Sequence, residues 1–314
     1  MEEDKAKFFK RTGMFLAILI FIFILVNIAY NKLVLPQKHV NKSEEQFMQN
    51  NNNNLKILFL GDSHPAWAVN PSYIKNSFNY ATPTETYEQT YYKLRSILSK
   101  DNKYQILVLP IDLHSFSDFK SDAYFNIWYW SRFMSINELQ NVTSKSLARI
   151  YFNKYFPFIG NGNEFKLVFF KSQKSVVING WYQREEIFAS KNMTKDALEK
   201  ARLHFKDGFE VKNERFFNFF IKILELSKSK DKKVIFIKYP ISEHYKFAAE
   251  SIGVDINEFY LSLNKSISKY SNVYVLDYQN YFTNYSLFSD SNHLNKLGAE
   301  FLSKKLDEYL RKFK

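Results

Sequence analysis

Short apolar runs alternate with helical patterns along most of the chain after residue 54. Strand-like composition is found at 55–60, 105–109, 234–239 and 273–276, and more weakly at 77–81. These runs are uniformly apolar, which indicates that both faces of each strand are covered. Helical spacing recurs between them, in Tyr87, Tyr91, Leu94 and Leu98 and again in Phe216, Phe220, Ile223 and Leu224. Strands separated by helices predict an α/β fold with a parallel sheet and right-handed crossovers.

The longest apolar run lies near the N-terminus, from Gly13 to Tyr30, and Asn27 is its only strongly polar member. Its 18 residues are just enough to span a bilayer. The run exceeds the apolar region of a typical signal peptide, and neither a small-x-small cleavage site nor a Cys for a lipoprotein anchor is present. We predict an uncleaved signal anchor over 13–30. The alternative, a buried core helix, would rarely lack a polar face.

Basic residues lie on both sides of this run, with Lys5, Lys7, Lys10 and Arg11 before it and Lys32, Lys38 and Lys42 after it. The preceding cluster favours a cytoplasmic N-terminus over residues 1–12 and places the remainder outside the cytoplasmic membrane. An outside location removes ATP, reducing power and DNA from the expected partners. The absence of Cys fits an exported protein but is also common in cytosolic ones.

Net charge narrows the expected partners further. The 314-residue chain carries 44 Lys and Arg against 32 Asp and Glu, which gives +12. Such a surface attracts nucleic acid, anionic lipid or acidic polymers. Because the charge is spread along the chain and the predicted location is outside, nucleic acid is disfavoured, and envelope polymers or lipid headgroups are the expected partners.

The predicted anchor is followed by a polar stretch, residues 31–54, which ends in a run of Asn and is predicted to be a tether. The folded domain is then expected over 55–314. Residues 115–207 break the strand–helix rhythm and are predicted to be an insertion, part helical and part irregular. Aromatic residues are dense at 124–133. Core packing is their expected role, with sugar stacking or contact with a membrane interface as alternatives.

The first strand run ends in LFLGDSH, so Gly61, Asp62 and Ser63 directly follow a predicted strand. Open α/β sheets place their sites beyond the carboxyl ends of the strands. Glycine permits a tight turn there. A serine held on such a turn can present its hydroxyl to a substrate while its backbone N–H helps to bind an oxyanion. Ser63 is therefore a candidate nucleophile.

A serine nucleophile needs a base, and the base needs an acid that orients it. Asp290 precedes His293 by three residues, at the start of a predicted helix. The apolar face of that helix comprises Leu294, Leu297, Phe301, Leu302, Leu306 and Leu310. Side chains three apart on a helical turn are neighbours, so Asp290 could accept from one imidazole nitrogen while the other faces Ser63. A simple cap or surface role for the histidine is the alternative.

Other polar side chains are expected near the same sheet edge. Asp112 and His114 follow the run at 105–109 and are expected to line the pocket, mainly in a structural role, while His64 is expected to point away from the nucleophile. Glu243 and His244 are expected to be ordinary loop residues, with a place at the pocket rim as the alternative. A metal site would compete with the serine chemistry, but no two histidines share a metal-ligand spacing, so neither metal nor cofactor is predicted.

LFLGDSH together with DSNHLNKLGAEFL resembles the SGNH (GDSL-like) hydrolase superfamily over residues 55–115 and 230–312. This resemblance implies a flavodoxin-like three-layer sandwich around a parallel central sheet. The N-terminal anchor and the long insertion resemble the envelope acyltransferase branch, which includes alginate O-acetyltransferases of the AlgJ and AlgX type and DltD-like D-alanine transfer proteins. Relatives of this kind transfer acyl groups to, or remove them from, envelope glycopolymers through an acyl-serine intermediate.

The resemblance assigns Ser63 as the nucleophile, His293 as the general base, Asp290 as its orienting acid and Asp62 as the residue that fixes the turn. The Gly-x-Asn-Asp block of the family reads Ile-Asp-Leu-His at 111–114, and no isolated Gly follows the second strand candidate, so the usual oxyanion donors are unassigned.

A membrane-anchored extracytoplasmic acyltransferase that O-acetylates an envelope or exported polysaccharide is the predicted function. Because acetyl-CoA is inaccessible outside the cell, the resemblance also implies a polytopic membrane partner that supplies the acyl group. An O-acetyl esterase with the same residues and a non-catalytic scaffold of a polysaccharide modification or export complex are the alternatives.

Overall fold

The computed structural model describes residues 2–50, 54–100, 103–120, 126–143, 145–159, 161–169, 176–185, 193–205 and 213–313. The chain divides into two compact units. The smaller unit comprises residues 1–41 and 126–174, and the larger comprises 42–125 and 175–314. The predicted insertion at 115–207 is thus shared between the two units.

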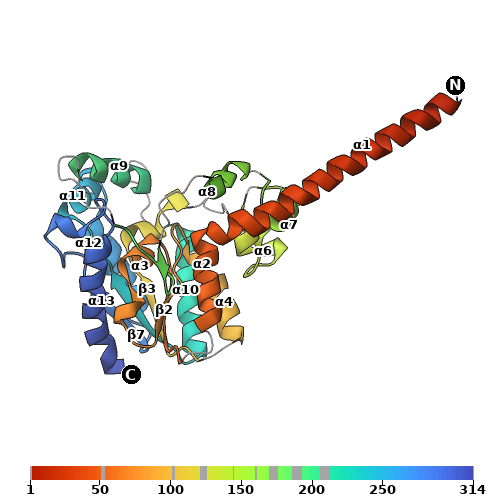
Figure 1. The fold of residues 1–314 in the computed structure, drawn as a ribbon. Coiled ribbons are helices and arrows are strands. Elements are labelled where there is room, and N and C mark those ends of the chain that lie inside the picture. The colour runs from red at the N-terminus through yellow and green to blue at the C-terminus, as the bar shows by residue number, and fades with distance from the viewer. Residues whose placement is uncertain are drawn as a thin grey trace. The chain divides into compact units, whose positions relative to one another are not determined.

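A five-stranded parallel sheet forms the centre of the larger unit (Figure 1). Its strands are β1 (Ile57–Phe59), β2 (Ser77–Asn79), β3 (Ile106–Pro110), β6 (Lys233–Lys238) and β7 (Val273–Asp277). The spatial order is β2-β1-β3-β6-β7, which is the flavodoxin-like order when these strands are numbered along the chain. The predicted α/β fold and all five predicted strands are confirmed.

Helices cover both faces of this sheet, as Figure 1 shows. On one face, α3 (Ser63–Ala68) and α13 (Lys296–Leu310) pack in a core with alternate residues of the strands. On the other face lie α4 (Tyr87–Lys100) and α10 (Glu214–Ser229), which contact each other. The larger unit also contains α9 (Met193–Phe205), α11 (Glu243–Ser251) and α12 (Ile256–Ile267).

The apolar face of α13 is narrower than predicted. Leu302, Leu306 and Leu310 are fully buried at helical spacing, and each such side chain contributes roughly 1.5–3 kcal/mol through burial. Leu297 and Phe301, which were expected on the same face, are each 47% exposed. The sequence pattern included Leu297 and Phe301 because they are apolar, but only the stripe of Leu302, Leu306 and Leu310 packs against the sheet.

Residues 31–54 contain helix α2 (His39–Gln49) where a tether was predicted. Its carboxyl-terminal part belongs to the larger unit, where the ring of Phe47 is buried and stacks on Tyr80 with 4.2 Å between ring centroids. Gln46 accepts a hydrogen bond from the Gly180 N–H and donates one to the Val177 carbonyl. One buried aromatic residue among polar neighbours left too weak an apolar pattern to predict this helix.

Residues 176–185 form a two-stranded antiparallel hairpin of β4 (Val177–Ile178) and β5 (Trp181–Tyr182) that was not predicted. Its turn is Asn179-Gly180, and both residues have positive φ. A Cβ on Gly180 would lie 1.7 Å from the Asn79 carbonyl oxygen, so only glycine fits. Asn-Gly between apolar residues is a strong hairpin signal that was available in the sequence.

The smaller unit contains α1 (Glu2–Ala29), α5 (Ile127–Trp130), α6 (Ile136–Val142), α7 (Leu147–Tyr155) and α8 (Lys166–Phe169). Trp128, Tyr129 and Trp130 are buried, which confirms core packing for this part of the aromatic segment, while residues 124–125 lie outside the described residues.

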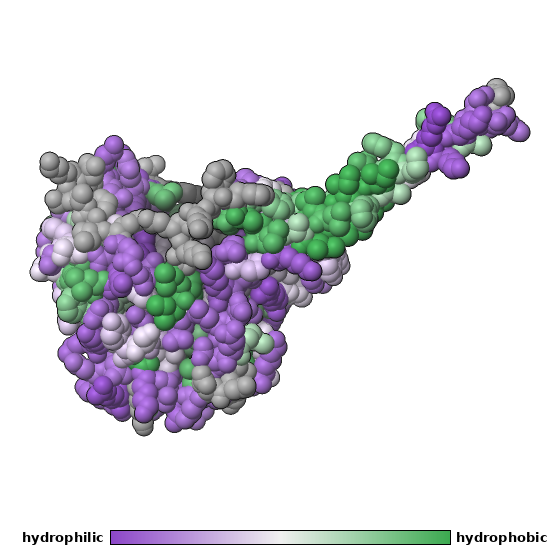
Figure 2. Space-filling view, in the orientation of Figure 1, coloured by the Kyte–Doolittle hydropathy of each residue, from purple (hydrophilic) through white to green (hydrophobic). Residues whose placement is uncertain are grey.

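Helix α1 is long and apolar enough to cross a membrane, and none of its apolar window is buried. Figure 2 shows a continuous apolar surface along this helix, with hydrophilic residues at its N-terminal end. Among the described residues, the apolar window of α1 is therefore not packed in a core as a buried core helix would be.

Candidate active site

Ser63 is held at the carboxyl end of β1 by the turn that begins at Gly61. Gly61 has a φ of 112°, and a Cβ there would lie 2.4 Å from Cδ of Pro110 at the end of β3. The Asp62 side chain accepts the His64 N–H and caps α3, so Ser63 becomes the first residue of the helix. The tight turn and the cap place a partly exposed serine where open α/β sheets bind ligands.

The three residues predicted to form the catalytic set are connected in series. Ser63 Oγ lies 3.0 Å from His293 Nε2, and His293 Nδ1 lies 2.9 Å from both carboxylate oxygens of Asp290. Because a carboxylate only accepts, His293 donates from Nδ1, which leaves the Nε2 lone pair facing the serine hydroxyl. This is the geometry in which an imidazole can remove the proton of a serine nucleophile.

Asp290 and His293 lie in a loop before α13, not on its first turn as predicted. The helix begins at Lys296, with Asn295 as its N-cap. Within the loop, Asp290 Oδ1 accepts the backbone N–H groups of Asn292 and His293. The two side chains therefore meet because the chain turns around the carboxylate.

Two cations that the sequence did not point to surround Asp290. Arg184 Nη1 lies 2.9 Å from Oδ2, and Lys200 Nζ lies 2.7 Å from Oδ1. Burial raises the pKa of Asp290, but His293 and Lys200 outweigh it and hold that pKa well below its usual range. The carboxylate is therefore ionised at neutral pH and can accept from His293 Nδ1.

The His293 imidazole is neutral near pH 7. Burial lowers the pKa of His293 to about 4, against the opposing effect of Asp290, while His64 and Lys200 lower it further. The indole of Trp67 meets the imidazole edge-to-face with 4.2 Å between ring centroids, and Arg184 lies over the same indole. The imidazole is thus confined between its hydrogen-bond partners and an aromatic wall.

Asp62 is the centre of a second buried polar group behind the turn. Its Oδ2 accepts from Lys120 Nζ at 2.5 Å and from Ser115 Oγ at 2.7 Å. Burial raises the pKa of Asp62, but Lys120 and His114 hold it well below its usual value. The sequence predicted that Asp62 fixes the turn but not that a buried lysine neutralises it.

His64 and Asp112 form another buried pair. His64 Nδ1 lies 2.7 Å from Asp112 Oδ2, and Asp112 Oδ1 accepts the Tyr239 N–H. Asp112 and His114, expected to line the pocket, are both buried. The His114 ring lies between those of His64 and His204, at centroid distances of 4.4 and 5.1 Å, and burial lowers the pKa of His114 to about 3.

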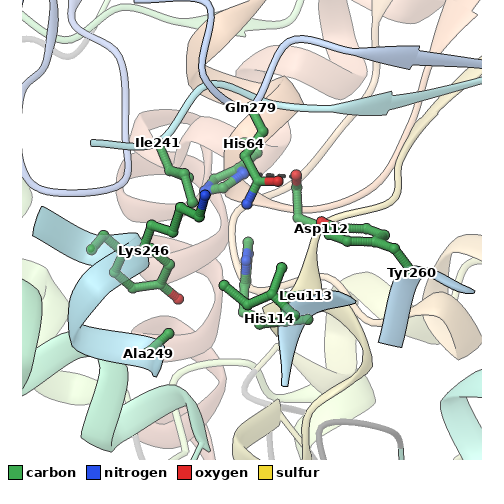
Figure 3. Close-up of a pocket in the computed structure, with 11 residues that line it drawn as sticks. His64, Asp112, Leu113, His114, Ile241, Lys246, Ala249, Tyr260 and Gln279 are labelled. Atoms are coloured by element: carbon green, nitrogen blue, oxygen red, sulfur yellow. Dashed lines mark hydrogen bonds and ion pairs between the residues drawn. The ribbon is translucent and has the colours of Figure 1, made fainter. Parts of the chain in front are cut away.

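A cavity of about 10 Å³, close to the volume that one water molecule requires, lies beside these residues. Figure 3 shows His64, Asp112 and His114 grouped around it with Tyr260 and Gln279. It is too small for a polymer substrate. Among the described residues, no group of three or more His, Cys, Asp or Glu is arranged to hold a metal ion.

The two remaining candidates, Glu243 and His244, lie at the start of α11. Glu243 is exposed, and His244 Nδ1 lies 3.2 Å from Thr194 Oγ1. In the segment that replaces the Gly-x-Asn-Asp block, the Ile111 N–H donates to the Ile237 carbonyl. The side chains of residues 111–114 are therefore buried, and the N–H of Ile111 pairs with β6 of the sheet.

No protein-family model matches the chain, and no curated protein matches it. Among solved structures, the chain is similar to a provisionally assigned acylhydrolase from Bacteroides fragilis, with 14% identity, a TM-score of 0.41 and coverage of 86% of this chain and 96% of that one. A GDSL-like lipase from Bacteroides thetaiotaomicron is similar at 10% identity and the same TM-score of 0.41, with coverage of 88% and 100%.

Proposed function

We propose that the chain is a serine acyltransferase of the SGNH type, anchored in a membrane by α1, that O-acetylates an envelope or exported polysaccharide. The observation that carries the proposal is the continuous series from Ser63 Oγ through His293 to Asp290. Ser63 and His293 are 230 positions apart along the chain, so the fold itself brings them together. A scaffold would have no reason to hold a partly exposed serine against a neutral imidazole and an ionised carboxylate.

In the acylation half-reaction, Ser63 Oγ attacks the carbonyl carbon of the acyl donor and passes its proton to His293 Nε2. Asp290 stabilises the imidazolium that forms, and the Ser63 backbone N–H donates to the developing oxyanion. Collapse of the tetrahedral intermediate expels the donor's leaving group, which takes the proton from His293. The products are the acyl-serine and neutral His293, which can accept a proton again in the second half-reaction.

In the second half-reaction, a sugar hydroxyl replaces the leaving group. His293 accepts the hydroxyl proton as the oxygen attacks the acyl-serine, and it returns a proton to Ser63 Oγ when the ester bond to the enzyme breaks. Water in place of the sugar would give an O-acetyl esterase with the same residues. The acceptor alone distinguishes the two activities.

The proposed location of the site outside the cytoplasm is supported by α1 and the basic residues before it. Lys5, Lys7, Lys10 and Arg11 favour a cytoplasmic N-terminus. No acetyl-CoA is accessible outside the cytoplasm, so a polytopic membrane partner would supply the acyl group. The net charge of +12 suits an anionic envelope polymer as acceptor.

A competition experiment tests transfer against hydrolysis. The full chain in detergent is given a small activated acetyl ester with and without candidate envelope oligosaccharides, and acetylated sugar and free acetate are both measured. The proposal expects acetylated sugar to form at the expense of acetate. Release of acetate alone with every acceptor would indicate the esterase.

The acylation rate should depend on pH through His293. Its pKa of about 4 means that the base is neutral above that value, so the rate should rise as pH passes through about 4 and be level from about 5 to 8. Asp290→Asn should lower the plateau by about 10⁴-fold. The variant should also shift the acidic limb of the pH–rate profile to lower pH, because Asp290 raises the pKa of His293. The burst rate with an activated ester, measured across pH, gives both the plateau and the limb. An acidic limb in the wild-type protein at the usual pKa of histidine would contradict the effect of burial.

Asn292 is expected to position the loop that carries Asp290 and His293. Its Oδ1 accepts from Lys200 Nζ at 3.0 Å, and its Nδ2 lies 3.3 Å from His64 Nε2. Asn292→Ala should slow acylation by about 10²-fold, mainly in kcat, because a small displacement of the base costs that much. Asn264→Ala, which replaces an exposed asparagine of α12, is the matched control. Equal rates for both variants would show that the loop holds its position without this contact.

A further inference from the structure

Helix α7 of the smaller unit carries an exposed aromatic face. Leu147, Tyr151, Phe152 and Tyr155 are 42%, 47%, 52% and 56% exposed. Their spacing of four, one and three residues places them on one side of the helix. Large apolar side chains gathered in this way usually mark a contact surface.

The same helix and the residues after it pack against the end of α1. Asn27 Nδ2 donates to the Tyr155 carbonyl at 3.3 Å. The ring of Phe23 lies 4.9 Å from that of Phe156 and 5.0 Å from that of Phe158, measured between centroids. Both elements belong to one compact unit. The depth of α1 in a membrane therefore sets the depth of the segment 155–158.

The depth of the segment 155–158 in the membrane follows from the length of the apolar run. The run from residue 13 to residue 30 has 18 residues and spans about 27 Å as a helix, which is close to the roughly 30 Å of the hydrocarbon core. If α7 stood in water, the part of α1 from Phe23 onward would stand in water with it. Only residues 13–22 would remain, about 15 Å of helix and half of what a span needs.

We infer that the aromatic face of α7 inserts into the outer leaflet of the bilayer that α1 crosses. Phe23 lies about 10 Å along the helix from Tyr30, so the rings that contact it lie below the membrane surface. Tyrosine and phenylalanine suit the interfacial region, and Arg149 and Lys154 of α7 can reach lipid phosphates from it. The inference rests on the membrane anchor of the proposed function but not on the serine chemistry.

This insertion would fix the smaller unit on the membrane at two places, α1 and α7. A single spanning helix leaves the attached unit free to tilt relative to the membrane plane. A second contact restricts that tilt and holds α5 and α6, which contact α7, close to the lipid surface.

Site-specific spin labelling tests the inference, because the chain has no native Cys. The full chain is reconstituted in vesicles of neutral and anionic phospholipid with one nitroxide per variant. Phe152→Cys reports on α7 and Leu19→Cys on α1. Leu261→Cys is the matched control, since Leu261 is an apolar residue of α12 in the larger unit that is 71% exposed. Power saturation with oxygen and with a water-soluble nickel complex gives the depth of each label.

The expected result is a Phe152 label that lies about 5–10 Å below the phosphates, a deeper Leu19 label and a Leu261 label in water. A deep Leu19 label with a Phe152 label as accessible to nickel as Leu261 would overturn the inference and leave the anchor intact. A Leu19 label in water would instead refute the anchor. A Phe152 label shielded from both reagents would mean that protein covers α7, which also overturns the inference.

Discussion

Replacing Ser63 with alanine is expected to reduce turnover of a small activated acetyl ester by about 10³-fold to 10⁶-fold, down to the level of binding and oxyanion stabilisation alone. The substitution removes the only oxygen within hydrogen-bond distance of His293 Nε2 among the interactions that the described residues show. Without it, no acyl-serine can form. The rate of acetate release, measured on the full chain, checks the expectation.

Ser72→Ala is the matched control for this experiment. Ser72 is an exposed serine nine residues further along the chain, and its backbone N–H is capped by Asn70. Its loss should leave both turnover and stability unchanged. If Ser63→Ala retained wild-type turnover while Ser72→Ala behaved normally, the proposed nucleophile would be wrong.

Asp62→Ala is expected to have the largest effect on stability. The variant leaves the Lys120 ammonium buried without its carboxylate, and breaking one side of a buried ion pair costs about 3–5 kcal/mol. It also removes the acceptor of the His64 N–H and with it the cap of α3. The free energy of unfolding from urea titration, followed by circular dichroism, measures the loss.

A double variant separates the charge from the cap. Asp62→Asn with Lys120→Met removes both charges and keeps a capping oxygen, so it should recover most of the stability that Asp62→Ala loses. Equal losses in the two variants would contradict the charge argument. The pH dependence gives a second check: because the folded pKa of Asp62 is lowered, its contribution is complete above about 3.9, the unfolded value, and is lost as pH falls toward the folded pKa.

The sheet and the position of the serine could be predicted from the sequence because their signals are local. Central parallel strands are apolar throughout, so β1, β3 and β6 stand out as short runs between polar segments. Gly61 and Ser63 lie directly after one such run, and the sheet's geometry then fixes where they are. His293 and Asp290 were recognisable by their spacing, although the loop that joins them differs from the predicted helical turn.

The partners of these residues could not be predicted because they come from distant segments. Arg184 and Lys200 reach Asp290 from the region expected to be an insertion, where nothing in their own neighbourhood distinguishes them from surface cations. Lys120 is likewise an isolated lysine in the sequence and a buried one in the fold. Ion pairs between residues that are distant along the chain leave no periodic pattern in the sequence.

The smaller unit could not be recognised from the sequence for a different reason. Residues 126–174 form a unit with the N-terminal helix, more than a hundred positions away, and not with the strands on either side of them in the chain. Their aromatic density marked them as unusual. The sequence alone did not indicate that α1 was the element against which they pack.

The central claim, an acyl-enzyme on Ser63, is tested most directly by rapid acid quench and mass spectrometry. The full chain is mixed with an activated acetyl ester, quenched within milliseconds, and analysed as intact protein and as peptides. The account predicts one acetyl group, located on Ser63, that forms in wild type and is absent from Ser63→Ala. An acetyl group on another residue, or none in protein that is shown to be folded, would contradict it.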